Sequence, residues 1–251
     1  MLKSRNQNIR KLSFLLGACL LFVIQVKAAT YHSRTSGNWN NTSTWSTSGC
    51  GGAAAGAFPV AGDIVTICSG HTVTITANPT CLDLTINSGG FLTTTALSAF
   101  IITVTNNMDV KTGGLVTLDY KGSTGGTGGN PGSSGGGLGV GGGGYGGNGG
   151  NGINLNAGTT NYGSITAPVD LGSGGGNSTN SGGSGGGALK VVANNVTVNG
   201  TIRADGQAGM SGAGGAGGGA GGSIWLSIGG TFSGTGTIRA HGGNGGGGTT
   251  A

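Results

Sequence analysis

The residues that could do acid–base chemistry are few and scattered. The chain of 251 residues has three histidines and six acidic side chains, all of them aspartate. A glycoside hydrolase needs two carboxylates facing one bond, and a calcium-dependent lyase needs carboxylates around the metal with a base nearby. The aspartates form no close pair in the sequence: Asp63, Asp83, Asp109, Asp119, Asp170 and Asp205. We therefore expect no enzyme activity, no cofactor and no metal site.

One set of polar residues nevertheless recurs at equivalent places. Asp119, Asp205 and His241 each follow the last strand of a similar sequence unit, and Arg203 and Arg239 precede two of them. Stacked units would bring these side chains to one edge, where they could contact a ligand or simply be solvated corner residues. Directly stacked arginines repel each other, which suggests a bound anion or an offset register.

Each tryptophan could have either a structural or a ligand-binding role. Trp39 and Trp45 are six residues apart and could cover the open end of a stack, or form a sugar-binding platform. Trp225 lies at an outward position opposite Lys190. It could be covered by glycine-rich backbone or be an exposed binding residue.

The N-terminal residues 1–28 are typical of a signal peptide. Lysines and arginines precede a short apolar stretch, and Ala28 ends a small-residue cleavage site. A lipid on Cys19 is the alternative, and we favour cleavage after Ala28. We therefore expect a secreted or cell-surface protein with no membrane span after cleavage.

Removal of this segment changes the charge and the cysteine count. The formal charge of +5 comes entirely from five basic residues of the segment, so six basic and six acidic residues remain. A neutral chain does not favour nucleic acid as a partner. Three cysteines also remain, Cys50, Cys68 and Cys81, and an exported chain favours a disulfide. We favour Cys68 with Cys81, and Cys50 with Cys68 is the alternative; the spacings match no zinc pattern.

Two similar stretches, residues 187–206 and 222–242, indicate how the chain is organised. Leu189 aligns with Ile224 at an offset of 35 residues, and Thr201 with Thr237 at an offset of 36. Looser copies occur at residues 84–92 and 108–119. Short alternating Val, Ile, Leu and Thr segments at such a period predict an all-β fold, a right-handed parallel β-helix in which each unit buries the face of the next.

Residues 122–187 contain thirty glycines among 66 positions. A flexible loop is the simpler interpretation. The other is a bundle of extended polyglycine II strands, which can pack closely because they lack side chains.

Several motifs resemble the β-helical modules of glycine-rich secreted surface proteins of the Bacteroidota. The matching stretches are residues 36–39 (SGNW), 43–45 (STW), 59–67, 69–75, 84–92, 217–226 and 234–245. The resemblance covers roughly half of the chain and implies export and surface display. Such proteins often end in a sorting domain, which residues 248–251 do not resemble, so we expect a longer chain or a separate partner.

Taken together, we expect four regions: a signal peptide (1–28), a cap with β-helix coils (29–121), a glycine-rich insertion (122–187), and further coils with glycine-rich loops (188–251). We interpret the protein as a non-enzymatic structural or adhesive component of the cell surface or matrix, with glycans or surface proteins as partners. The alternatives are a polysaccharide-binding or polysaccharide-cleaving β-helix and, because outward threonines could form a ladder, an ice-binding protein. The threonines are Thr66, Thr74, Thr85, Thr103, Thr117 and Thr197.

Overall fold

The computed structural model of the protein describes residues 28–129, 140–146, 148, 151 and 162–249. Within these residues the chain is all-β and forms no α-helix; a single 3₁₀ turn, η1, spans Thr42–Thr44. No helix of the described part is long and apolar enough to cross a membrane.

The larger sheet has the strand order β14-β11-β9-β7-β4-β1-β3, with β15 beside β11 and β6 beside β9. Its pairs are parallel except for β1 with β3, which closes the N-terminal end as an antiparallel pair. Its strands are β1 (Thr30–Ser33), β3 (Trp45–Ser46), β4 (Ile64–Ile67), β6 (Thr80–Cys81), β7 (Asp83–Ile86), β9 (Ala99–Val110), β11 (Ala188–Val198), β14 (Ser223–Ile228) and β15 (Phe232–Ser233).

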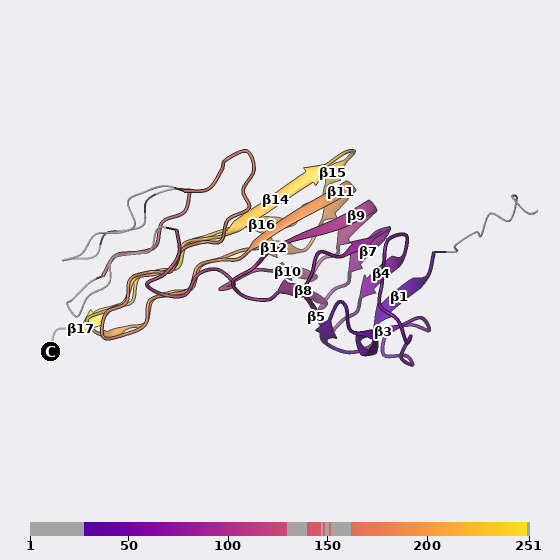
Figure 1. The fold of residues 1–251 in the computed structure, drawn as a ribbon, viewed down its shortest axis with the longest axis horizontal. Coiled ribbons are helices and arrows are strands. Elements are labelled where there is room, and N and C mark those ends of the chain that lie inside the picture. Colours follow the sequence, from indigo (N-terminus) through magenta and orange to yellow (C-terminus); the bar gives the residue numbers. More distant parts are fainter. Residues whose placement is uncertain (1–27, 130–139, 147, 149–150, 152–161, 250–251) are drawn as a thin grey trace, which may run out of the picture.

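The smaller sheet has the order β16-β12-β10-β8-β5-β2 and is parallel throughout. From β4 on, the chain alternates between the two sheets, so each passage through both adds one layer (Figure 1). The strands of this sheet are β2 (Gly37–Asn38), β5 (Thr72–Ile75), β8 (Phe91–Thr94), β10 (Leu115–Thr117), β12 (Thr201–Arg203) and β16 (Thr237–Arg239). A third pair, β13 (Gly212–Ala213) with β17 (Gly248–Thr249), lies far from both sheets.

The core follows from the alternation of apolar residues along each strand. Successive side chains of a strand point to opposite faces, so every second residue turns inward. The inward residues are register neighbours from layer to layer: Val65, Leu84, Met108 and Val196 in the larger sheet, and Val73, Leu92, Val116 and Ile202 in the smaller. All of them are buried and belong to one apolar cluster that runs along the stack.

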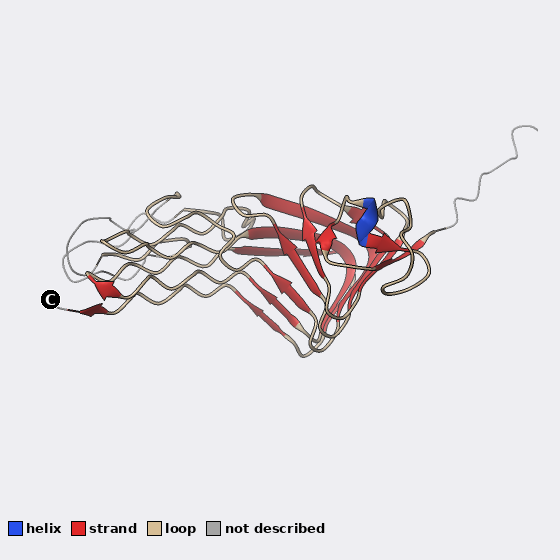
Figure 2. Ribbon diagram, turned by 90° about the horizontal axis from the view of Figure 1, so that it is seen from below, coloured by secondary structure: helices blue, strands red, loops and turns tan. Residues whose placement is uncertain are grey.

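The glycine-rich segments continue each layer beyond the sheets. We call the extended segments 122–126, 141–143, 172–176, 182–186, 204–210, 216–222 and 241–246 the glycine bundle; they run side by side toward β17 (Figure 2). Amides three residues apart donate to the same neighbour: Gly183 and Gly186 donate to the carbonyls of Gly217 and Ala220. A three-residue period is that of an extended helix, whereas a β-strand has a period of two.

Glycine is required in this bundle by the closeness of neighbouring backbones. A Cβ atom at Gly186 would overlap the carbonyl oxygen of Ala204, and one at Gly219 would overlap that of Ser184. Both obstructing atoms belong to the backbone, so they cannot turn aside as a flexible side chain could. The bundle segments therefore pack at a separation that only glycine allows.

Candidate functional site

The polar residues singled out in the sequence lie where the smaller sheet meets the glycine bundle. Thr117, Arg203 and Arg239 end β10, β12 and β16 and are register partners. Two residues further on, the amide of Asp205 donates to Oδ1 of Asp119 at 2.9 Å, and the amide of His241 donates to Oδ1 of Asp205 at 2.9 Å. The structure therefore brings Asp119, Asp205 and His241 into one row, which we call the carboxylate row.

Each carboxylate of this row also pairs with an arginine of the next layer. Oδ2 of Asp119 lies 2.6 Å from Nε of Arg203, and Oδ2 of Asp205 lies 2.8 Å from both Nε and Nη2 of Arg239. The two arginines are in register, so the expected offset is wrong. Their repulsion is offset by the interleaved carboxylates and needs no bound anion.

The arrangement of these carboxylates suits a structural role better than a catalytic one. The side chains of Asp119 and Asp205 are only 10% and 14% exposed, and both oxygens of each have partners. General acid–base catalysis needs a carboxyl oxygen that can reach a substrate proton. His241 is exposed and belongs to the outermost layer, so it is the member of the row whose ring is open to a ligand.

Trp39 and Trp45 form the N-terminal cap. Trp45 is fully buried and Trp39 is 4% exposed, and their rings meet edge to face at a centroid distance of 5.3 Å. The indole of Trp45 donates to the carbonyl of Trp39 at 2.6 Å, and that of Trp39 donates to the carbonyl of Pro59 at 3.3 Å. Neither ring presents a free face, so this pair is not a sugar-stacking surface.

Trp225 lies on the outer face of the larger sheet. It is the register partner of Lys190, whose Nζ lies 3.5 Å from the centroid of the indole ring. A hollow of about 170 Å³ adjoins this pair and is lined by Ile101, Val169 and Lys190 among others. Ile101 and Val169 are 40% and 45% exposed, so a cation, an aromatic ring and apolar side chains meet on this surface.

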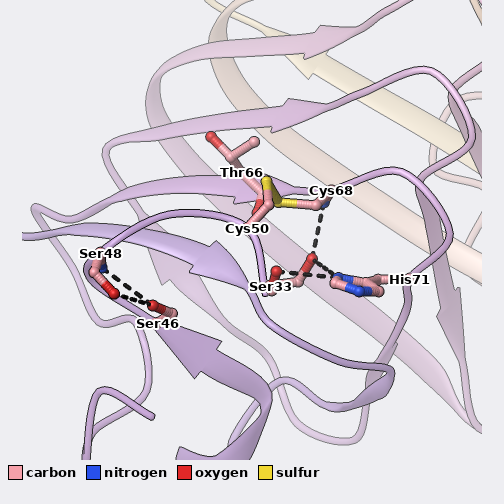
Figure 3. The surroundings of a disulfide bond; sticks show 7 residues. All are labelled: Ser33, Ser46, Ser48, Cys50, Thr66, Cys68 and His71. Atoms are coloured by element: carbon pink, nitrogen blue, oxygen red, sulfur yellow. Dashed lines mark hydrogen bonds between the residues drawn. A yellow bond between two sulfur atoms is a disulfide. The ribbon is translucent and has the colours of Figure 1, made fainter. Parts of the chain in front are cut away.

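The disulfide joins Cys50 to Cys68, with their Cα atoms 5.9 Å apart, and the favoured pairing of Cys68 with Cys81 is wrong (Figure 3). The register of β4 with β7 places Cys81 beside the start of β4, whereas Cys68 follows its end. At about 3.3 Å per residue the two are roughly 20 Å apart along the strands, too far for a disulfide. Cys81 is a free, buried thiol.

Beside the disulfide lies a contact that sequence reasoning missed. Oγ of Ser33 is 2.9 Å from Nδ1 of His71 and accepts the amide of Cys68 at 2.8 Å (Figure 3). Ser33 is fully buried, so this serine–histidine pair anchors the disulfide segment and is closed to a substrate. The partners are 38 residues apart in neighbouring layers, and no local motif marks them.

His32 is the other group close to the disulfide. One of its ring nitrogens and the sulfurs of Cys50 and Cys68 lie within 4.8 Å of one another. Metal ions bind thiolates, and both sulfurs are here committed to the disulfide. The group is therefore not a metal site in the oxidised protein.

The outward threonines do not form one unbroken ladder. Thr66 pairs with Thr85, and the next position in that row is Asp109. Thr74 pairs with Thr93 and Thr93 with Thr117, and the next position in that row is Arg203. Thr103 is in register with Val192 and belongs to neither row. Charged side chains therefore interrupt both threonine rows after two or three members.

Comparison of the chain with protein-family models, with curated proteins and with solved structures finds no match.

Proposed function

We propose that the protein is a non-enzymatic structural or adhesive component of the cell surface or extracellular matrix. Its fold would be a right-handed parallel β-helix continued sideways by a polyglycine II bundle. Parallel strands joined by crossovers are nearly always connected with a right-handed turn. The alternation between two sheets and the three-residue period of the glycine hydrogen bonds support this description.

The observation that carries the functional proposal is how the aspartates are used. Four of the six carboxylates hold neighbouring backbone or side chains: Asp63 binds the amides of Ala29 and Val60, Asp83 binds Asn106 and Asn107, and Asp119 and Asp205 form the carboxylate row. Asp109 pairs with Lys111 and lines, together with Asp83, a hollow of about 420 Å³. Carboxylates committed to holding layers together suit a rigid extended body. A catalytic site needs such groups open toward a cleft.

Two observations support export. The disulfide Cys50–Cys68 is the kind of bond that persists in oxidising compartments. In addition, the amide nitrogen of Ala29 lies 3.0 Å from Oδ1 of Asp63, which is only 7% exposed. Cleavage after Ala28 would turn this amide into an ammonium group, and the contact would become a stronger, charge-assisted one.

The surface role is tested on native cells and on purified protein. We expect antibody labelling at the cell surface, an intact-mass measurement that begins at Ala29, and no release of reducing ends from a panel of polysaccharides. Release of reducing ends or of unsaturated products would overturn the non-enzymatic assignment. Retention in the cytoplasm with residues 1–28 intact would overturn export.

Glycan binding is the second candidate, and the pair of Lys190 and Trp225 beside an apolar hollow favours it. Trp225→Ala should abolish retention on a glycan array if this surface binds sugar. Ice binding is a weaker proposal because charges interrupt the threonine rows, and an assay without thermal hysteresis or ice shaping would exclude it.

A further inference from the structure

The segment 216–222 is the best-connected strand of the glycine bundle, and its amides point in three directions. Those of Gly217 and Ala220 donate to the carbonyls of Gly176 and Ser173. Those of Gly219 and Gly222 donate to the carbonyls of Gln207 and Ala204. Each of these two directions is repeated every third residue, and each is filled by one neighbouring segment.

In the part of the chain that the structure describes, no segment fills the third direction. Among the described residues, no acceptor is paired with the amide of Gly218 or of Gly221, although Gly218 is buried. These two amides lie on the floor of a groove of about 490 Å³, between a wall that includes Gly143 and Tyr145 and a wall that includes Gly242 and Gly243. The walls themselves donate to this segment, Gly143 to the carbonyl of Gly218 and Gly243 to that of Gly219.

The groove therefore has the form of an unfilled strand position. A buried amide without an acceptor destabilises a protein. Gly218 is buried and Gly221, three residues further on, is half-buried. In an extended helix rising 3.1 Å per residue, that is about 9 Å. Carbonyls of another strand in the same conformation repeat at the same distance, so one strand can satisfy both amides.

The walls restrict what can enter. Elsewhere in the bundle, a Cβ atom facing a neighbouring strand would overlap its carbonyls, as at Gly186 and Gly219. An occupant packed at the same separation must likewise be an extended chain with glycine at the positions that face the floor. A peptide with larger side chains at those positions would meet the carbonyls of the floor.

The protein itself carries such a strand. Residues 242–248 read GGNGGGG and are largely exposed, and their first two residues form one wall of the groove. The same segment would therefore form a wall of the groove in its own chain and fill the groove of a second copy. Such a surface is self-complementary, as a twofold dimer requires. Charge does not oppose this, because between residues 207 and 249 the basic side chains are Arg239, paired with Asp205, and His241.

We propose that two copies of this chain associate through the glycine bundle, each placing its segment 242–248 in the groove of the other against the amides of Gly218 and Gly221. The same outer layer also exposes Phe232 and Ile238, 55% and 39% accessible, which adds apolar surface beside the bundle. This assembly does not depend on the proposed surface role, so either one can fail without the other.

The test compares two substitutions in the outermost layer by light scattering across a dilution series. A Cβ at Gly242 meets only the carbonyl oxygen of Gly219, at 3.6 Å, so Gly242→Leu enters the groove without disturbing the bundle. The matched control is Gly229→Leu, whose Cβ meets only Oδ1 of Asn194 at 3.6 Å, outside the groove. We expect a wild-type dimer, weakened roughly tenfold or more by Gly242→Leu and unchanged in Gly229→Leu.

A second measurement needs no variant. A labelled peptide with the sequence GGNGGGG should bind the wild-type protein and compete with dimerisation, and the same peptide with alanine for glycine should not. A monomer at all concentrations, or a dimer insensitive to Gly242→Leu when circular dichroism shows that the variant is folded, overturns the proposal. Peptide binding by a protein that stays monomeric also overturns it, because the occupant is then not a second copy.

Discussion

The stacked sheets and the glycine bundle are two halves of the same layers, held together in different ways. In the sheets, the side chains of residues such as Leu84 and Ile202 fill the space between neighbouring strands and are fully buried. In the bundle, the contacts are made by backbone amides and carbonyls, and segments approach until no Cβ fits. The sheets depend mainly on the hydrophobic effect, whereas the bundle depends on hydrogen bonds that must offset the large backbone entropy of glycine.

Each layer of the chain therefore combines two kinds of packing, one through side chains and one through the backbone. The sheets should tolerate a change of one apolar residue for another and respond to lost volume. The bundle should be indifferent to apolar volume and respond to an added atom wherever a glycine faces a neighbouring backbone closely, as Gly186 does.

Removing volume from the sheets should have the largest effect. Leu84→Ala deletes a fully buried side chain next to Val65 and Met108, and we expect a loss of about 3–4 kcal/mol in unfolding free energy. Urea denaturation followed by tryptophan fluorescence measures it, since Trp45 reports on the same core. Leu84→Met, which nearly conserves volume, is the control. Equal losses in both variants would contradict a volume-dependent core.

Adding one methyl group to the bundle should open it locally. Gly186→Ala forces a Cβ onto the carbonyl of Ala204, and we expect about 1–3 kcal/mol of destabilisation confined to the bundle. Hydrogen exchange should rise in segments 182–186 and 204–210 while strands such as β7 and β9 keep their protection. Gly247→Ala, whose Cβ would meet only Oγ of Ser211 at 3.8 Å, should change little. Uniform loss of protection in both halves would show that they unfold together.

The carboxylate row lies between the two halves, and its loss should weaken their connection. Asp205→Asn keeps an oxygen for the amide of His241 and removes the charge that holds Arg239. We expect a loss of about 0.5–1.5 kcal/mol, because the arginine side chain is 37% exposed and solvent screens the pair. Asp109→Asn is the control, since it removes the more exposed pair with Lys111 and should cost less. A double-mutant cycle with Arg239→Gln isolates the coupling, and a zero coupling energy would contradict the ion pair.

Alkaline pH should weaken the sheets through one buried thiol, by about as much as the loss of the ion pair. Burial, reinforced by the charges of Asp83 and Asp63, raises the pKa of Cys81 from 9.0 to about 12. The unfolded chain then releases this proton at a lower pH than the folded one, so the contribution of the thiol to stability is complete below pH 9 and is lost as the pH rises toward 12.

From pH 8 to pH 10 we expect a loss of about 1 kcal/mol from this thiol. Wild type and Cys81→Ala are compared by urea denaturation at both values, and the variant should lose less than the wild type. Identical losses would mean that Cys81 does not remain protonated in the folded protein.

Much of the layer register was accessible from the sequence. The alignment of Leu189 with Ile224 and of Thr201 with Thr237 predicted pairs that are register partners in the structure. The alternation of apolar and polar residues identified the inward side chains, because successive side chains of a strand point to opposite faces of the sheet. The stacked positions of Asp119, Asp205 and His241 were visible for the same reason, and the buried state of Trp39 and Trp45 matched the capping interpretation.

The amino-acid sequence alone therefore predicts which residues turn inward and where layers align, and it leaves open whether the glycine-rich segments are flexible or packed. Only the tertiary structure decided the partners: Cys50 for Cys68, the interleaved arginines for the carboxylates, and Ser33 for His71. These contacts join residues that are 18 to 84 positions apart in the sequence. Such pairs depend on the register between neighbouring strands and on the conformation of the loops between layers. Neither the register nor the loop conformation can be derived from the spacing of residues within one segment.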